Sequence, residues 1–284
     1  MIDSSNIDRN NNIVWTISSS DCCAGTGIQA DLHTFHDFDC YGCSVITALA
    51  AQNSFTTGYT VATERKSLVA QINALDSDMP AAVIKVGMLP NRELLETVIK
   101  YLQDFDGFVV YDPELNHSAS LLPDAAELLK AELLPRTDLL LVNTEEVQML
   151  VDIDVDSAPA MTTAANSLLA LGARAVLLTG ARFDNLAGKR LDYWSDGQRG
   201  LWASVQTADN VNNRGGGSTL SAALAAAIAR GHAIEEALRL AKAYVTQGIR
   251  QPNRLGGGPG SVAHLGLPRD DRDMPLIGPK LSVV

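Results

Sequence analysis

Residues 81–114 read AAVIKVGMLPNRELLETVIKYLQDFDGFVVYDPE, and this stretch decides the fold class. Its two ends, residues 81–88 and 107–114, carry short apolar runs rich in β-branched residues, which are typical of buried strands. Between them, residues 92–105 repeat apolar side chains at the three- and four-residue spacing of an amphipathic helix. A strand, a helix and a second strand form a unit in which the two strands are parallel and the crossover is right-handed.

The same alternation runs through most of the chain and predicts one α/β domain. We expect further strands at residues 13–19, 44–53, 137–143 and 173–180, and helices at residues 27–38, 65–78, 125–134, 144–151, 163–172, 218–231 and 233–251. Residues 191–207 contain an Asp-Gly turn between two apolar runs and predict a small hairpin. No Pro- or Gly-rich linker divides the chain. We therefore expect a polar N-terminal tail at residues 1–12, a single domain at 13–267 with a mostly parallel sheet covered on both faces, and a loosely ordered tail at 268–284.

The composition disfavours nucleic acid and membranes as partners. Of the 284 residues, 22 are Lys or Arg and 33 are Asp or Glu, which gives a formal net charge of -11, whereas nucleic-acid binding requires a basic surface. The N-terminal stretch MIDSSNIDRNNNIVW lacks the basic and then apolar order of a signal peptide. No apolar run has the length of a membrane span. We expect a soluble, cytoplasmic protein.

Four cysteines occur in two pairs, Cys22-Cys23 and Cys40-Tyr-Gly-Cys43. The second pair has a spacing found in zinc sites. Adjacent cysteines such as the first pair chelate poorly, because their side chains tend to diverge, and no pair of histidines completes a ligand set. We expect reduced thiols, as is usual for a cytosolic protein.

Several polar motifs follow the predicted strands, and ligands of open α/β sheets bind at the carboxyl ends of strands. Residues 25–30, GTGIQA, match a dinucleotide fingerprint, but the next strand ends in AAQN rather than in the acid that would bind a ribose. The glycines of NNRGGGS at 212–218 precede an alanine-rich helix, whose first amides can bind an anion. Asp112 and Glu146, at two other strand ends, could act on Mg²⁺ directly or through its waters, as phosphoryl transfer requires. A tight turn and helix caps would also account for these residues one by one.

Residues 27–53, GIQADLHTFHDFDCYGCSVITALAAQN, closely resemble the hydroxymethylpyrimidine/phosphomethylpyrimidine kinases of thiamine biosynthesis, in the ribokinase-like superfamily. Members of that family read approximately AGxDxxGGAGIQADLKT and then YGxSVITALxAQN. The similarity continues through IKVGML, YDP, the Asn of NTEE, STLSAALAAAIA and GGGPGSVAHLG. The resemblance implies a ribokinase-like three-layer α/β/α fold and a homodimer. It also implies the ATP- and Mg²⁺-dependent phosphorylation of 4-amino-5-hydroxymethyl-2-methylpyrimidine and then of its monophosphate.

The resemblance also implies roles for individual residues. On the substrate side it places Asp31 in the substrate-site helix, Gln52 on the aminopyrimidine, Met88 against its ring and Glu114 facing the substrate. It places Asp112 and Glu146 near Mg²⁺ and the phosphates, Gly215 and Gly217 in an anion hole, and Ser218 at the position of the catalytic base. On the nucleotide side it places Asn143, Thr179 and Gly258.

The sequence departs from the family pattern at five places, which are concentrated where the resemblance places the chemistry. Ser218 replaces a Cys, Arg214 replaces a His, Thr179 replaces a Lys, and Glu114 replaces an apolar residue, while SSSDCCAGTG at 18–27 replaces a loop of small residues. An alcohol cannot take a substrate proton at neutral pH without a base of its own. Three hypotheses stay open: a kinase of this family with reduced turnover, a non-catalytic relative that binds pyrimidine or nucleotide, and a related kinase whose substrate has shifted.

Overall fold

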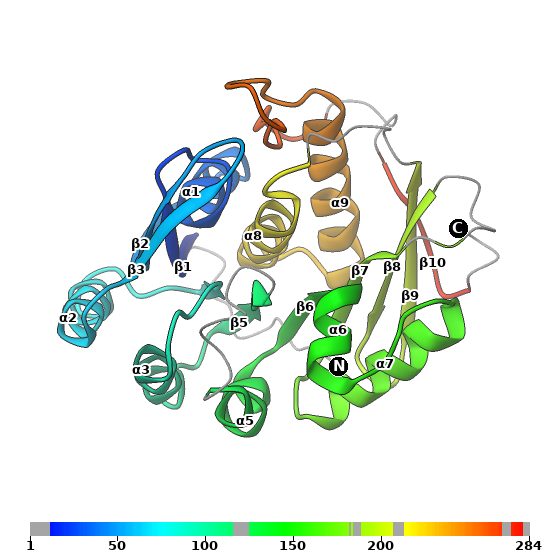
Figure 1. Ribbon diagram of the computed structural model, residues 1–284. Coiled ribbons are helices and arrows are strands. Elements are labelled where there is room, and N and C mark those ends of the chain that lie inside the picture. Colours follow the sequence, from blue (N-terminus) through cyan, green and yellow to red (C-terminus); the bar gives the residue numbers. More distant parts are fainter. Residues whose placement is uncertain are drawn as a thin grey trace.

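A computed structural model describes residues 12–115, 125–181, 183, 189–206, 213–268 and 274–280. Within these residues the strands form one ten-stranded sheet in the order β10-β9-β8-β7-β6-β5-β4-β1-β2-β3. Helices cover both faces of the sheet, with α2, α3, α5, α6 and α7 on one side and α1, α8 and α9 on the other (Figure 1). The expected three-layer α/β/α architecture is confirmed.

The centre of the sheet is parallel, as residues 81–114 predict. The parallel strands are β1 (Ile13–Asp21), β2 (Tyr41–Gln52), β4 (Val83–Val86), β5 (Phe108–Tyr111), β6 (Leu139–Asn143) and β7 (Val176–Ala181). Antiparallel strands extend both edges: β3 (Thr57–Ala62), β8 (Lys189–Ser195), β9 (Gly200–Gln206) and β10 (Leu276–Gly278). The predicted hairpin is confirmed as β8 and β9.

Two edge strands lie where the sequence does not predict them. The side chains of β3 are exposed except for the last, which is half-buried, so no buried alternation marks the strand. The three residues of β10 pair with β9, although they belong to the segment expected to be loosely ordered. Residues 1–11 of the expected N-terminal tail lie outside the described residues. The domain boundaries therefore stay predictions.

The helices follow the predicted segments. They are α1 (Gly27–Asp37), α2 (Arg65–Asp76), α3 (Arg92–Leu102), α5 (Ala126–Leu128) with its continuation to Arg136, α6 (Thr144–Val151), α7 (Ala158–Ala170), α8 (Gly216–Ala229) and α9 (Ile234–Arg250). None of the helices in the described ranges is long and apolar enough to cross a membrane.

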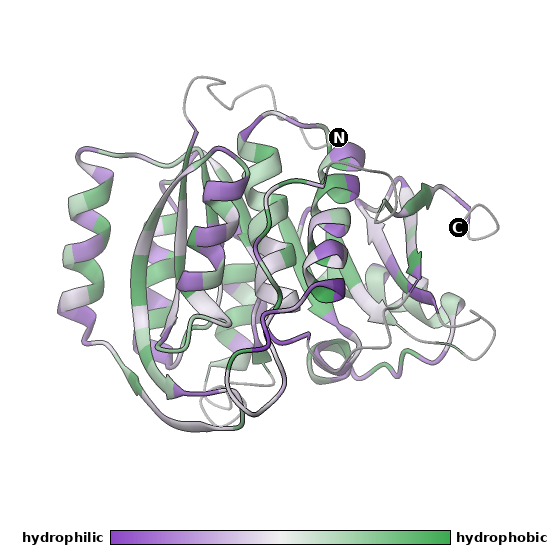
Figure 2. Cartoon of the chain, turned by 90° about the horizontal axis from the view of Figure 1, so that it is seen from above, coloured by the Kyte–Doolittle hydropathy of each residue, from purple (hydrophilic) through white to green (hydrophobic). Residues whose placement is uncertain are grey.

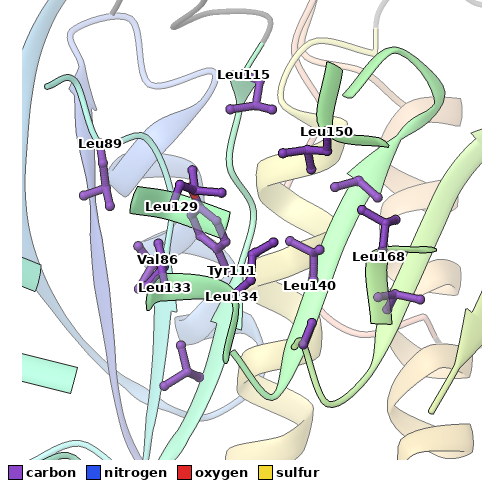
Figure 3. Packing of buried hydrophobic residues seen from close by; sticks show 14 of the residues in the cluster. Val86, Leu89, Tyr111, Leu115, Leu129, Leu133, Leu134, Leu140, Leu150 and Leu168 are labelled. Carbon is purple, nitrogen blue, oxygen red and sulfur yellow. The ribbon is translucent and has the colours of Figure 1, made fainter. Parts of the chain in front are cut away.

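Two hydrophobic cores lie on opposite faces of the sheet. Trp15 and Ile17 point into the core under α2, α3, α6 and α7, whereas Val14 points into the core under α1, α8 and α9, because successive side chains of a strand alternate between faces. Figure 3 shows part of the first core, where Leu129, Leu133 and Leu134 lie beside Val86 and Tyr111. In Figure 2 the helix at the left edge of the view, α2, carries both hydrophilic and hydrophobic residues.

Helix α8 is the innermost helix and positions the site. Every residue from Ser218 to Ala229 is buried, as expected for a helix whose whole circumference is apolar or small. Its alanines leave room for close packing between α1, α9 and the sheet. The N-terminus of α8 is therefore held firmly at the carboxyl ends of the central strands.

Candidate active site

Two cavities lie at the carboxyl ends of the parallel strands. The larger, of about 580 Å³, is lined by Ser19, Thr26, Ala50, Gln52, Thr57, Thr60, Met88, Asp112, Glu114, Asn143, Glu146 and residues 213–218. The smaller, of about 430 Å³, is lined in part by Asn143, Thr179, Gly180, Arg190, Lys242 and Thr246. Both volumes suit small molecules. The cavities share Asp112, Asn143, Glu146, Asn213, Gly216 and Gly217, so a group at the start of α8 is accessible from both.

Ten of the twelve residues that the resemblance selects line one or both cavities. The exceptions are Asp31, which is fully buried, and Gly258, which packs on the turn after β2. The Gly258 amide donates to Ser54 Oγ at 3.1 Å, so the GGGPG loop supports the rim of the larger cavity.

The glycines before α8 form a cradle that requires glycine at one position. Gly215 has φ +81°, and a Cβ at this residue would overlap the carbonyl oxygen of Gly25. Gly216 is the first residue of α8, and a Cβ at this residue would meet no atom within 4 Å. The amides of Gly217 and Ser218 belong to the first helical turn, where the partial positive charge of the helix favours an anion.

Asp31 lies beneath the larger cavity, in a buried ion pair. Lys85 Nζ is 3.0 and 2.9 Å from its two carboxylate oxygens, and neither side chain is exposed. Thr16 Oγ1 also donates to Asp31 at 2.5 Å. Burial opposes the charge on Lys85, but the carboxylates of Asp31 and Glu114 outweigh it and raise its pKa. Asp31 therefore has a partner inside the protein, and sequence reasoning overlooks Lys85 because it lies within an apolar strand.

Ser218 is not isolated from a base. Its hydroxyl donates to Glu114 Oε1 at 3.0 Å, and Lys85 Nζ lies 3.9 Å from the same oxygen. Glu114 has φ +49°, a left-handed backbone that is uncommon for this residue type. Burial of the Glu114 carboxyl, together with the charges of Asp112 and Asp31 and against that of Lys85, raises its pKa to about 7.

Glu146 organises the backbone at the junction of the two cavities. Its two carboxylate oxygens accept from the amides of Leu115, at 2.9 Å, and Asn143, at 3.0 Å. Asn143 Oδ1 accepts from the Glu146 amide in return, which completes a capping box at the start of α6. Burial and the charge of Asp112 raise the pKa of Glu146 to about 8.

Asp112 is the acid that lies at the junction of the cavities. It accepts from Ser221 Oγ at 2.7 Å through Oδ2 and lines both cavities. Mg²⁺ is commonly held by one or two carboxylates, phosphate oxygens and waters. Asp112 fits such an ion better than Glu146 does, because both Glu146 oxygens already accept from amides. In the described part of the chain, no cluster of three or more His, Cys, Asp or Glu is arranged to hold a metal by itself.

Arg214 joins the two loops that border the larger cavity. Its guanidinium donates to the carbonyl of Asn53 at 2.5 Å and to Asp21 Oδ2 at 3.3 Å. Asp21 also accepts from the amides of Cys23, at 2.9 Å, and Thr26, at 3.0 Å. These hydrogen bonds and the charge of Arg214 outweigh burial and lower the pKa of Asp21. Arg214 therefore holds the altered first loop against the glycine cradle.

The four cysteines are free thiols in the structure. Cys22 and Cys23 are exposed on the loop after β1, whereas Cys40 and Cys43 are buried. Cys22 Sγ donates to the carbonyl of Gln52 at 3.2 Å, so this thiol packs at the rim of the larger cavity.

Comparison with known proteins identifies the family. The sequence profile of phosphomethylpyrimidine kinase matches residues 21–263. The chain is 36% identical over 255 residues to the hydroxymethylpyrimidine/phosphomethylpyrimidine kinase of Streptomyces coelicolor, and the alignment covers 89% of this chain and 94% of that relative. The chain belongs to the phosphomethylpyrimidine kinase family.

Solved structures agree with membership of the phosphomethylpyrimidine kinase family. The pyridoxal kinase of Staphylococcus aureus in complex with ADP matches with a TM-score of 0.85 at 27% identity, over 94% of this chain and 98% of that chain. The phosphomethylpyrimidine kinase of Clostridium difficile 630 matches with a TM-score of 0.71 at 29% identity, over 82% of this chain and 99% of that chain. The expected ribokinase-like fold is confirmed.

In this phosphomethylpyrimidine kinase family member, cations line the smaller cavity although Thr179 provides none. Thr179 Oγ1 lies 3.5 Å from the carbonyl of Val142, at the end of β7. Arg190 and Lys242 line the same cavity. Lys242 pairs with Asp192, so its ammonium is positioned by β8.

Proposed function

We propose that the protein transfers the γ-phosphate of ATP to 4-amino-5-hydroxymethyl-2-methylpyrimidine and then phosphorylates the resulting monophosphate, in thiamine biosynthesis. The observation that carries this proposal is the meeting of two cavities at Asp112 and the first turn of α8. Phosphoryl transfer depends mainly on positioning two molecules and stabilising charge between them. Two cavities that share a helix N-terminus and a carboxylate support such a reaction.

The larger cavity suits the pyrimidine. The Gln52 side chain donates to Thr26 Oγ1 at 3.2 Å and accepts from Thr57 Oγ1 at 2.9 Å, so the amide is held at the cavity wall. An amide can donate to and accept from a pyrimidine edge, and the Met88 thioether provides an adaptable apolar surface for the ring. Asp31 contributes through Lys85 to the floor of this cavity rather than by contact with the substrate.

The smaller cavity suits the nucleotide, with Asn143 and Thr179 in its wall and Arg190 and Lys242 as its cations. The γ-phosphate would meet the amides of Gly217 and Ser218. Mg²⁺ would neutralise charge on the phosphates and would be held by phosphate oxygens and by waters that Asp112 orients.

The direct test is incubation of the purified protein with Mg·ATP and the hydroxymethylpyrimidine, followed by mass spectrometry. The monophosphate should form first and the diphosphate later, and Asp112→Asn should abolish both products. Pyridoxal serves as the competing substrate, because pyridoxal kinases are among the structural neighbours. Exclusive phosphorylation of pyridoxal would overturn the substrate assignment but not the kinase assignment.

A non-catalytic role is the second candidate, and the replacement of a Cys by Ser218 favours it. Titration calorimetry with the pyrimidine and with Mg·ATP separates the two functions. Binding of both ligands without any product would support the non-catalytic role. Failure to bind either ligand would contradict both functions.

We also propose that the protein is a cytoplasmic homodimer. Three large apolar side chains are exposed at one edge of the sheet: Leu49 of β2 at 52%, Phe55 of the following turn at 69% and Tyr59 of β3 at 66%. Because β3 is also an edge strand, this surface is suited to contact with a second copy of the chain. Free thiols are usual in a reducing compartment. Light scattering should give twice the chain mass, and Tyr59→Lys should reduce it to the mass of one chain.

A further inference from the structure

The contact between Ser218 and Glu114 brings together two residues that are 104 positions apart in the chain. Both line the larger cavity at its junction with the cradle. The serine hydroxyl has one hydrogen, and it is directed at Glu114 Oε1 over 3.0 Å. The lone pairs of the same hydroxyl oxygen are then left to accept a hydrogen from a ligand in the cavity.

We propose that Ser218 and Glu114 form a proton relay, in which Ser218 takes the proton of the substrate hydroxyl and passes its own to Glu114. The inference rests on the proposed function and assigns its proton acceptor. Ser218 is the residue that contacts the substrate, and Glu114 acts through it. The pair supplies the base that an isolated alcohol lacks.

The charges around Glu114 suit a proton acceptor. Lys85, from β4, is the cation that faces it, at 3.9 Å, and this ammonium already pairs with both oxygens of Asp31 from α1. Ser218 Oγ, at 3.0 Å, is closer to Glu114 Oε1 than the Lys85 ammonium is. Glu114 Oε1 is therefore positioned to receive the Ser218 proton, while Lys85 remains paired with Asp31.

The backbone of Glu114 is a second observation in favour of the relay. A left-handed conformation at a non-glycine residue is strained and is retained mainly where the surroundings demand it. Here φ is +49°, and the side chain that results is only 14% exposed and lies against Ser218 and Lys85. The strained turn directs the carboxylate inward rather than to solvent.

The chemical step balances within this geometry. The hydroxymethyl oxygen forms a bond to the γ-phosphorus while the bond from that phosphorus to the bridging oxygen of ATP breaks, and the bonding electron pair leaves with ADP. The hydroxyl proton moves to Ser218 Oγ as the Ser218 proton moves to Glu114 Oε1. Glu114 returns the proton to water after the product leaves.

The test compares Glu114→Gln in two backgrounds, the natural serine and Ser218→Cys, with the pyrimidine and Mg·ATP. Glutamine keeps the size of the side chain but cannot take the proton. In the serine background kcat should fall by about 10²–10⁴-fold with KM nearly unchanged, the range typical of a lost general base. In the Ser218→Cys background the fall should be less than about tenfold, because a thiolate can accept a proton by itself. Glu96→Gln, the same change at an exposed site, should leave kcat unchanged.

Each possible outcome supports or overturns the proton relay. A loss of equal size in both backgrounds, or a rise in KM without a fall in kcat, would overturn the relay and leave the proposed function intact. An active natural enzyme that is unaffected by Glu114→Gln would do the same. An enzyme that phosphorylates neither the pyrimidine nor pyridoxal would overturn the proposed function and the relay together. Melting curves of all variants exclude a loss of folding as the cause.

Discussion

Lys85 and Asp31 form an ion pair from which water is excluded, and Lys85→Met tests what the pair contributes. Neither side chain is exposed, and the ammonium lies 2.9 Å from one carboxylate oxygen. Removing one member of such a pair leaves an uncompensated buried charge and typically costs about 3–5 kcal/mol. Because folded domains are stable by only about 5–15 kcal/mol, this loss should be a large part of the free energy of unfolding.

Urea unfolding followed by tryptophan fluorescence measures the loss, since Trp15 and Trp194 are fully buried in the two cores. The double variant Asp31→Asn/Lys85→Met should be more stable than Lys85→Met alone, because neither buried group then carries a charge. Glu96→Gln breaks an exposed pair with Arg92 and is the control, with an expected change of about 0.5 kcal/mol or less. A loss below about 1 kcal/mol for Lys85→Met would refute the reasoning.

Three further predictions concern the loops and the pH response. Gly215→Ala should lower the free energy of unfolding by about 1–3 kcal/mol and reduce kinase activity, because it adds strain at φ +81° and a clash with Gly25. Gly216→Ala is the control and should be tolerated. Equal melting temperatures for the two variants would contradict this prediction. Arg214→Met should raise KM for the pyrimidine more than KM for ATP, since Arg214 joins the walls of the larger cavity, and steady-state kinetics with unchanged KM values would disprove that role. Burial and the nearby His33 lower the pKa of His264 from 6.5 to about 4. Between pH 6.5 and pH 4 the unfolded chain therefore binds more protons than the folded chain, and the free energy of unfolding should fall as the pH drops through this range. His264→Gln should flatten the fall in melting temperature between pH 6.5 and pH 4, and an unchanged slope would argue against it.

The sequence predicts the centre of the fold well because hydrophobic periodicity reports burial. The parallel strands are buried on both faces, and each helix between them has an apolar stripe or is apolar throughout. Strands β3 and β10 escape prediction because edge strands need no buried face, and their pairing depends on neighbours distant in the chain. Burial patterns carry no information about such pairing.

The candidate site is predicted less completely because its chemistry arises from tertiary contacts. Most of the residues that the resemblance selects, including Gln52 and Asp112, line the cavities. It does not indicate that Asp31 forms an ion pair with Lys85. It also treats Ser218 and Glu114 as separate departures, although their side chains are hydrogen-bonded to each other. These relations depend on distances between elements, which spacing along one chain does not contain.

The central claim is that one phosphate position, at the start of α8, is shared by a nucleotide cavity and a pyrimidine cavity. A crystal structure with the pyrimidine and a non-hydrolysable ATP analogue measures this most directly. The account predicts the γ-phosphate on the amides of Gly217 and Ser218, beside Asp112, with the hydroxymethyl oxygen within hydrogen-bonding distance of Ser218 Oγ. A γ-phosphate bound away from the first turn of α8, or a pyrimidine outside the larger cavity, would contradict it.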